Sequence, residues 1–444
     1  MSGAHNIDFG VVGRTNVDLY ADEVEFEIRD KEIILKVEGG DISILVDQTP
    51  SEAVDKVTSL TKLDKLIEGL AYEGVIAGGV SNSVTELQKH RSENPNLRLR
   101  MLNPMNPELH LGDEKFNVIK SFESYDTMTH CLNKRTLQFN LILRNGRNKL
   151  IIRNKSESGP LYSLDSLDRS LLKQFVNINN AFLLNAPNHP ALTDLILSEI
   201  YKYNQAYLRD LGCNLNSSQP HVLVNETAFA PGISYKKVTT VITASKALDK
   251  DFILSRVIPF TSSIFNLEDL LNLFAKKGAE DLPPIDFSDH QNSGIEERYG
   301  QALTLLTKMR YGILTRQGTL ARVLDPFQNI YVTDGRYGHL VCHASENDPR
   351  KFEVSLYGLN KKDLKSFAEF ISTLRYSTNG FGDSFAAGVA LAEAMRDKDP
   401  QEVAASASSF VATRAGYHRT YQAQDIVLHA RWTLKAGTQA ERIK

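Results

Sequence analysis

The residues best suited to chemistry in this sequence lie together near its C-terminal end, in the stretch STNGFGDSFAAG over 377–388. Gly380 and Gly382 flank one residue, Asp383 follows at once, and the small and apolar residues over 386–394 have good helix propensity. This pattern predicts a glycine-bearing loop that leads into the N-terminus of a buried helix. The first N–H groups of a helix have no intrahelical partner and lie at its positive end, so they favour an anion, most often phosphate. Asp383 would then face the oxygen that attacks the phosphate.

A purely structural interpretation of the same stretch stays open. Asp383 is also a favourable N-cap residue, and glycines are common in tight turns. Short glycine-rich patterns also arise often by chance. The choice between the two interpretations therefore depends on polar residues elsewhere in the chain.

Two polar residues follow the first predicted strand. Residues 9–13 (FGVVG) predict a short buried strand, and Asn16 and Asp18 come shortly after it. Open α/β sheets bind ligands at the carboxyl ends of their strands, so this pair is a candidate ligand site. A polar turn after a strand is the alternative.

A second candidate segment follows the strand predicted over 330–333 (IYVT). The strand breaks at Asp334, and the segment from Thr333 through Gly335 to Gly338 brings a hydroxyl and close backbone to the strand end. This combination suits a phosphate group. Taken alone, the segment is equally consistent with a hairpin turn.

A third candidate segment places acidic residues after a strand. The strand predicted over 263–266 ends in Asn266, and Glu268 and Asp269 open the following helix. Oxygen donors of this kind organise the water shell of Mg²⁺. Acids in the first turn of a helix are also favoured by the helix dipole alone, and this explanation stays open.

The N-terminal third of the chain contains signals for a small, separate sheet. Period-two alternation over 24–44 predicts three short antiparallel strands, and the pair Asn145-Gly146 predicts a hairpin within 121–155. Strands so closely spaced leave no room for crossover helices, so they do not belong to a parallel sheet.

The rest of the chain alternates between strands and helices. Buried strands are predicted over 182–186 and 221–225, and helices over 51–70, 191–207, 301–309 and 404–413. This alternation favours a parallel, doubly wound α/β sheet. The charged, proline-bearing segment 275–299 predicts a surface loop.

Composition narrows the class of protein. The 444 residues are 42% hydrophobic and 24% charged, which is typical of a soluble globular protein, and the net charge of −3 gives no electrostatic case for nucleic acid or an anionic membrane. The apolar runs fall short of the roughly 18 apolar residues needed to span a bilayer, and the first residues do not resemble a secretory signal. Cys131, Cys213 and Cys342 are too far apart to indicate a disulfide framework or a zinc site. We therefore expect a cytoplasmic protein.

The candidate segments, taken in order, resemble the motifs of the ribokinase-like (PfkB) carbohydrate kinases. Within the C-terminal motif of that family, usually [DN]-T-x-G-A-G-D-x-F, the matching residues are Thr378, Gly380, Gly382, Asp383 and Phe385. Ser377 and Phe381 depart from it. The other matches are N-x-D at Asn16 and Asp18, a partial G-G-x-x-x-N at Ala77, Gly78, Gly79 and Asn82, N-x-x-E at Asn266 with Asp269 in place of Glu, and T-x-G-x-x-G at Thr333, Gly335 and Gly338.

The resemblance, which extends over residues 7–416, implies a fold and a set of roles. The expected fold is α/β, a ribokinase-like, doubly wound, mostly parallel sheet with helices on both faces and a small antiparallel β lid, in a single kinase domain over 1–444. The lid comprises 20–47 together with 121–155, and in this family it is often shared at a homodimer interface. The chain is longer than most members, and we expect the extra length in loops near 100–120, 200–220, 275–299 and 343–372.

The implied activity is transfer of the γ-phosphoryl group of ATP, with Mg²⁺, to a hydroxymethyl group of a sugar or nucleoside. The catalytic residues would be Asp383 as base with Gly380, Phe381 and Gly382; the acceptor-binding residues would be Asn16, Asp18, Gly78, Gly79 and Asn82. Nucleotide binding would fall to Thr333, Gly335, Gly338, Thr378 and Gly416, and metal binding through water to Asn266, Glu268 and Asp269. Small molecules, and neither nucleic acid nor membrane, are then the expected partners.

Two rival functions are compatible with the same motifs. A catalytically silent protein of this fold would bind a small molecule or a protein partner, and the departures at Ala77, Ser377 and Phe381 are typical of altered motifs. The retained Asp383 argues against it. An enzyme that uses ADP as the phosphoryl donor is the second rival, and the sequence does not distinguish the donors.

Overall fold

The structure is a computed structural model. It describes residues 6–13, 15–29, 32–37, 40–45, 70–92, 95–103, 108–111, 114–123, 128–131, 138–145, 148–153, 169–185, 190–210, 238–244, 248, 250–257, 261–275, 282–285, 294–311, 329–345, 351–373, 380–395, 399–435 and 440–443. The helix predicted over 51–70 and the strand predicted over 221–225 lie outside these residues.

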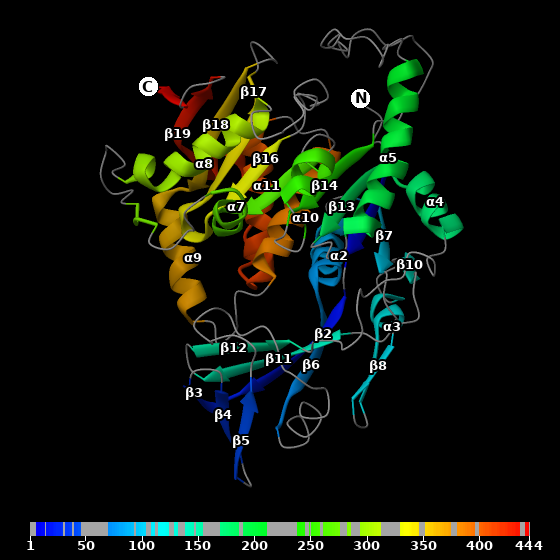
Figure 1. The fold of residues 1–444 in the computed structure, drawn as a ribbon, viewed down its shortest axis with the longest axis vertical. Coiled ribbons are helices and arrows are strands. Elements are labelled where there is room, and N and C mark those ends of the chain that lie inside the picture. Colours follow the sequence, from blue (N-terminus) through cyan, green and yellow to red (C-terminus); the bar gives the residue numbers. More distant parts are fainter. Residues whose placement is uncertain are drawn as a thin grey trace.

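An eleven-stranded sheet runs through the centre of the molecule, in the order β10-β7-β1-β13-β14-β15-β16-β17-β18-β19-β20 (Figure 1). Its strands are β1 (Ile7–Gly13), β7 (Leu97–Asn103), β10 (Met128–Cys131), β13 (Ala181–Asn185), β14 (Thr239–Thr243), β15 (Ser262–Asn266), β16 (Ile330–Thr333), β17 (His339–Ala344), β18 (Phe352–Leu359), β19 (Ile426–Leu434) and β20 (Glu441–Ile443). From β10 to β16 neighbouring strands are parallel, and from β16 to β20 they are antiparallel. The doubly wound, mostly parallel α/β fold is therefore confirmed.

Helices cover both faces of this sheet. They are α2 (Gly79–Lys89), α3 (Val118–Glu123), α4 (Arg169–Ile178), α5 (Pro190–Asp210), α6 (Lys250–Phe252), α7 (Leu267–Phe274), α8 (Ile295–Arg310), α9 (Lys361–Thr373), α10 (Phe381–Ala394) and α11 (Pro400–Arg414). Side chains of successive strand residues point to opposite faces. Val11 of β1 accordingly joins the core that includes α2, α10 and α11, whereas Val12 joins the core that includes α4, α5, α7 and α8.

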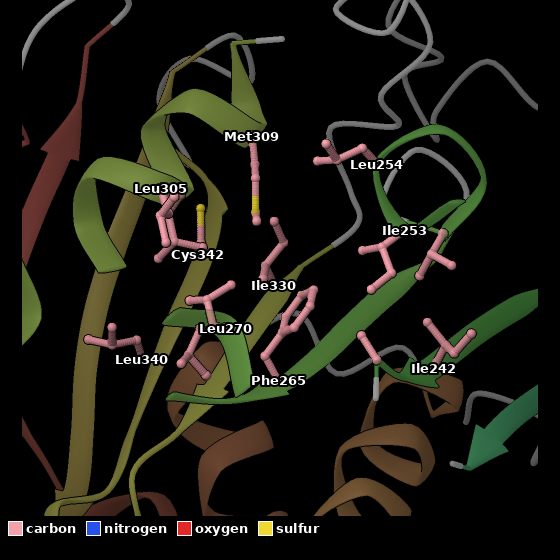
Figure 2. Packing of buried hydrophobic residues seen from close by; sticks show 14 of the residues in the cluster. Ile242, Ile253, Leu254, Phe265, Leu270, Leu305, Met309, Ile330, Leu340 and Cys342 are labelled. Atoms are coloured by element: carbon pink, nitrogen blue, oxygen red, sulfur yellow. The ribbon is translucent and has the colours of Figure 1, made fainter. Parts of the chain in front are cut away.

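Figure 2 shows the second of these cores, in which Phe265 of β15 and Ile330 of β16 lie beside Leu270 of α7 and Met309 of α8. Phe265 is fully buried and Ile330 is 1% exposed. Burying apolar side chains of this size stabilises the fold by about 1.5–3 kcal/mol each. This packing fixes β15 and β16 against α7 and α8.

Smaller sheets lie at one end of the molecule, below α2 and α10 in Figure 1. A four-stranded sheet has the order β12-β11-β2-β6, with β2 (Asn16–Asp22), β6 (Glu73–Ala77), β11 (Gln138–Asn145) and β12 (Asn148–Arg153). A three-stranded antiparallel sheet contains β3 (Glu25–Arg29), β4 (Glu32–Val37) and β5 (Gly40–Leu45), and a hairpin contains β8 (Glu108–Leu111) and β9 (Glu114–Asn117). The three strands predicted from the alternation over 24–44 are confirmed.

The predicted lid region differs from expectation in two ways. Within 121–155 only β11 and β12 form the hairpin, because β10 pairs with β7 at the edge of the main sheet. In addition, β11 pairs with β2 in parallel, so the four-stranded sheet is mixed.

The prediction of extra loop length over 343–372 is wrong. This region contains β18, most of α9 and the end of β17. In the part of the chain that the structure describes, no helix is long and apolar enough to cross a membrane.

Candidate active site

Asp383 lies in the first turn of α10. The N-cap is Gly380, whose φ of 82° is left-handed and favours glycine, and the N–H of Ser384 donates to the Gly380 carbonyl over 2.9 Å. Phe381, Gly382 and Asp383 therefore belong to the helix, not to the loop that we predicted, and Asp383 is not the N-cap. Their three N–H groups precede the first intrahelical bond and lie at the positive end of the helix.

Two amide side chains hold the Asp383 carboxylate. Nδ2 of Asn82 donates to Oδ2 over 2.7 Å, and Nδ2 of Asn185 donates to Oδ1 over 3.0 Å. A carboxylate offers about four lone-pair directions, so two such bonds fix its orientation and leave acceptor capacity for a hydroxyl group. Asp383 itself is partly exposed.

Asn185 is the functional candidate that the sequence prediction missed. It ends β13, is 1% exposed, and its Nδ2 also lies 2.6 Å from Oγ of Ser83 and 2.9 Å from the Gly79 carbonyl. Its Oδ1 accepts from Oγ1 of Thr243 over 3.0 Å. The available signal was a polar residue at the end of the apolar run FLLN, the same signal that selected Asn16 and Asp18.

The G-G motif leads from β6 into α2 and delivers Asn82. Gly78 is the N-cap of α2 with a φ of 96°, and the Asn82 N–H donates to its carbonyl over 2.9 Å. A Cβ atom at Gly79 would lie 3.0 Å from Cγ and 3.2 Å from the carbonyl oxygen of Asn185. Glycine at 79 therefore lets α2 approach the end of β13 closely enough for Asn82 and Asn185 to reach the same carboxylate.

Asn16 and Asp18 lie on β2, beside the strand that leads into α2. Asn16 is in register with Ala77, the last residue of β6. Both are nearly buried, and Nδ2 of Asn16 donates to Oδ1 of Asp18 over 2.5 Å. Asn140 of β11, which the sequence prediction did not include, donates to the same oxygen over 2.7 Å.

The Thr333 segment forms a tight turn between β16 and β17. Oγ1 of Thr333 donates to the Phe265 carbonyl over 3.3 Å, and a short 3₁₀ turn spans Gly335–Tyr337. Gly338 approaches β18 so closely that a Cβ atom there would lie 2.0 Å from the Tyr357 carbonyl oxygen. The segment therefore has the geometry of a hairpin turn, as one of the two interpretations predicted. Its role in nucleotide binding stays a prediction.

A buried ion pair fixes this turn from α8. Asp334 accepts from Nε of Arg298 over 2.5 Å, from Nη2 over 2.7 Å, and from the Tyr299 hydroxyl over 2.7 Å. The Arg298 guanidinium also lies 4.3 Å from the ring centre of Tyr337. The hydrogen bonds to Asp334 raise the pKa of Arg298, and burial, with the adjacent Asp334 charge, raises the pKa of Tyr299.

The proposed metal residues lie at the carboxyl end of β15 in the main sheet. Asn266 ends β15, is in register with Thr333 of β16, and its Oδ1 caps α7 by accepting from the Glu268 N–H over 2.9 Å. Glu268 is exposed and Asp269 is partly buried. Among the described residues, no group of three His, Cys, Asp or Glu could hold a metal ion directly. Oxygen donors at this place fit Mg²⁺ only as an ion held largely through water and phosphate oxygens, which is its usual binding mode.

The main sheet thus brings several motifs together at the carboxyl ends of its parallel strands. Because β13 to β16 are parallel neighbours, their carboxyl ends place Asn185, Thr243, Asn266 and Thr333 along a line. This is where open α/β sheets bind ligands. Gly416 follows α11 with a φ of 79° and is exposed, and Thr378 lies outside the described residues.

Comparisons with solved structures identify the fold. The ribokinase from Giardia lamblia superposes with a TM-score of 0.51 at 14% identity, covering 95% of this chain and 97% of that one. The adenosine kinase from Trypanosoma brucei brucei superposes with a TM-score of 0.50 at 10% identity, covering 94% of this chain and 100% of that one. No protein-family model and no curated protein sequence matches the chain. The chain therefore has a ribokinase-like fold, as its motifs predicted, and at these identities the likeness concerns the fold alone.

Proposed function

We propose that this protein is a kinase that transfers the γ-phosphoryl group of ATP to a hydroxymethyl group of a sugar or nucleoside. The observation that carries the proposal is the Asp383 carboxylate, held by Asn82 and Asn185 beside the N–H groups that precede the first intrahelical bond of α10. Phosphoryl transfer requires positioning and charge stabilisation more than covalent chemistry. This arrangement offers an oriented acceptor for a proton next to donors for a phosphate.

Each part of the site then has a role. Asp383 accepts the proton of the attacking hydroxyl, and the N–H groups of the Gly380-Phe381-Gly382 segment and Asp383 stabilise charge on the transferring group. A side chain added at Gly382 would meet no atom within 4 Å, so the backbone there is open to a ligand. Phe381 is the first helical residue, and its N–H precedes the first intrahelical bond of α10.

The acceptor and the nucleotide bind on different strands in this proposal. Asn16, Asp18, Gly78, Gly79 and Asn82 hold the hydroxyl groups of the acceptor, whereas Thr333, Gly335, Gly338, Thr378 and Gly416 hold the nucleotide. When bound, Mg²⁺ neutralises the phosphate charge. Asn266, with Glu268 or Asp269, would hold its water ligands at the end of β15.

The experiment is a screen of sugars and nucleosides with ATP and Mg²⁺, followed by ADP release. Turnover with one class of acceptor, lost in Asp383→Asn, supports the proposal. Turnover only with ADP as the donor would support the ADP-dependent alternative. Ligand binding detected by thermal shift, without turnover with either donor, would support the catalytically silent alternative.

Several expectations stay predictions under this proposal. They are one kinase domain over 1–444, a cytoplasmic location, the absence of nucleic-acid and membrane partners, and a homodimer formed through the β lid. The apolar residues Ile33 and Leu35 of β4 are fully buried within a single chain, so a dimer would have to use another surface of the lid.

A further inference from the structure

Arg414, the last residue of α11, contacts Asn82, one of the two residues that hold Asp383. Its Nη2 donates to Oδ1 of Asn82 over 3.2 Å, and its Nη1 lies 3.5 Å from Oε1 of Glu86. A Cβ atom at Gly380 would lie 3.1 Å from Nε and Nη2 of Arg414. The guanidinium therefore packs against the residue that caps α10.

The contact with Arg414 favours the same orientation of the Asn82 amide as the contact with Asp383. A guanidinium only donates hydrogen bonds, so it can pair with Oδ1 of Asn82 and not with Nδ2. Nδ2 is then directed at Oδ2 of Asp383, which as a carboxylate only accepts. With the amide reversed, its NH2 group would face the guanidinium donors of Arg414 and its oxygen would face the carboxylate of Asp383.

Glu86 holds Arg414 in this position. Its side chain is fully buried, and Oε1 lies 2.9 Å from Nζ of Lys89 as well as close to Arg414. Asn82 and Glu86 are four residues apart in α2 and so share one face of the helix. The rings of His90 and Phe410 stack at 3.9 Å and fix α2 against α11 farther along.

We propose that Arg414 is a positioning residue: anchored by Glu86, it orients the Asn82 amide so that this amide fixes the Asp383 carboxylate toward the acceptor hydroxyl. The inference rests on the proposed kinase function. The competing role is a direct contact between the guanidinium and the transferring phosphate, which would make Arg414 a catalytic residue.

A double-mutant cycle in kcat separates the two roles. The proteins are the native chain, Asn82→Ala, Arg414→Met and the double variant, assayed with the acceptor found in the screen. If Arg414 acts through Asn82, Arg414→Met lowers kcat by roughly tenfold, leaves the KM for ATP within about twofold, and causes no further loss once Asn82 is absent. Additive losses would overturn the proposal in favour of the direct contact.

Lys89→Met is the matched control. It removes the other cation from Glu86 without touching Asn82 and should leave kcat unchanged, and Arg414→Lys, which retains a donor, should recover part of the activity. A loss in Lys89→Met as large as that in Arg414→Met would overturn the proposal, because the effect would then come from the charge of Glu86.

The side-chain amide signals of Asn82 in NMR spectra provide a readout that needs no turnover. We expect them to shift in Arg414→Met and to stay in place in Lys89→Met. If neither the native protein nor any variant turns over, but the Asn82 signals shift in Arg414→Met, the kinase function fails and the orienting contact stands. If the native protein turns over and neither kcat nor the signals respond to Arg414→Met, the positioning role is overturned.

Discussion

Nδ2 of Asn185 donates to Oδ1 of Asp383 over 3.0 Å, although 198 residues separate the two in sequence. One residue ends a parallel strand of the main sheet, and the other lies in the first turn of a helix that packs on that sheet. The bond therefore links the carboxyl ends of the strands, where ligands bind in such folds, to the carboxylate that we propose as the base.

Asp383→Asn should lower kcat by about 10² to 10⁴ and leave nucleotide binding nearly intact, because the amide cannot accept the proton of the attacking hydroxyl. Steady-state kinetics and ATP titration measure the two effects separately. Turnover equal to that of the native protein would rule out the role of Asp383 as base.

Asn185→Ala should lower kcat and also reduce the free energy of unfolding by about 1–3 kcal/mol. The buried amide is lost and leaves the Thr243 hydroxyl and the Asp383 carboxylate with fewer partners. Asn180→Ala, just before the same strand, is the control for activity, since its partly exposed amide bonds to the Asn6 carbonyl and the Asp8 N–H and its loss should leave kcat unchanged. Equal losses of kcat in the two variants would contradict a special role for Asn185.

Asp18→Ala should weaken acceptor binding more than ATP binding. Asp18 is 8% exposed and accepts hydrogen bonds from the amides of Asn16 and Asn140, so its loss removes a partner from both amides at the proposed acceptor site. Separate titrations of the two ligands give the comparison. Equal losses for both ligands would indicate misfolding instead, and Glu27→Ala, an exposed carboxylate on β3, is the control that should alter neither.

His339→Gln should flatten the pH dependence of stability on the acid side. Burial lowers the pKa of His339 from 6.5 to about 4, so between these values the unfolded chain binds a proton that the folded chain does not. The free energy of unfolding therefore falls as the pH drops from about 6.5 to about 4, and removing the imidazole should reduce this fall by on the order of 3 kcal/mol. Urea unfolding of both proteins at several pH values measures this difference. Burial also lowers the pKa values of His343 and His429, so these residues account for part of the pH dependence that remains in the variant.

The lid prediction concerns residues 20–47 with 135–153. If these segments close over the acceptor and exclude water, hydrogen exchange across β2, β4 and β11 should slow when acceptor binds, while β13 changes little. Ile33 and Leu35 of β4 are fully buried, as they would be if the lid were a fixed part of the core that is protected without ligand. Complete protection without ligand, in a protein that stays monomeric, would mean that the segment is a fixed part of the core.

Local patterns in the sequence were enough to predict much of the fold. Alternation with period two predicted β3, β4 and β5, and apolar runs predicted β13 and β16. Helices were expected over 191–207, 301–309 and 404–413, where α5, α8 and α11 lie, although α8 begins at Ile295, within the segment predicted as a surface loop. These signals are local because an element shows its buried face in its own residues. The order of the motifs at strand ends then predicted the ribokinase-like arrangement.

The start of α10 and the partners of Asp383 were not predictable in this way. A glycine pair before an acid is compatible with either a loop or a first helical turn, and the left-handed cap at Gly380 decided the outcome. Asn185 and Arg414 reach the site only after β13, α2, α10 and α11 have packed together. Their signal in the sequence was no stronger than that of any polar residue at the end of a strand or helix.

The sequence by itself therefore determined the elements and the candidate residues at their ends, because hydrophobic periodicity and glycine placement are properties of short segments. Only the tertiary structure decided which of these residues meet, such as Asn82 and Asn185 at Asp383 or Arg298 at Asp334. The physical reason is that hydrogen bonds between distant residues depend on how packed helices and strands are placed relative to one another, and no local pattern encodes that placement.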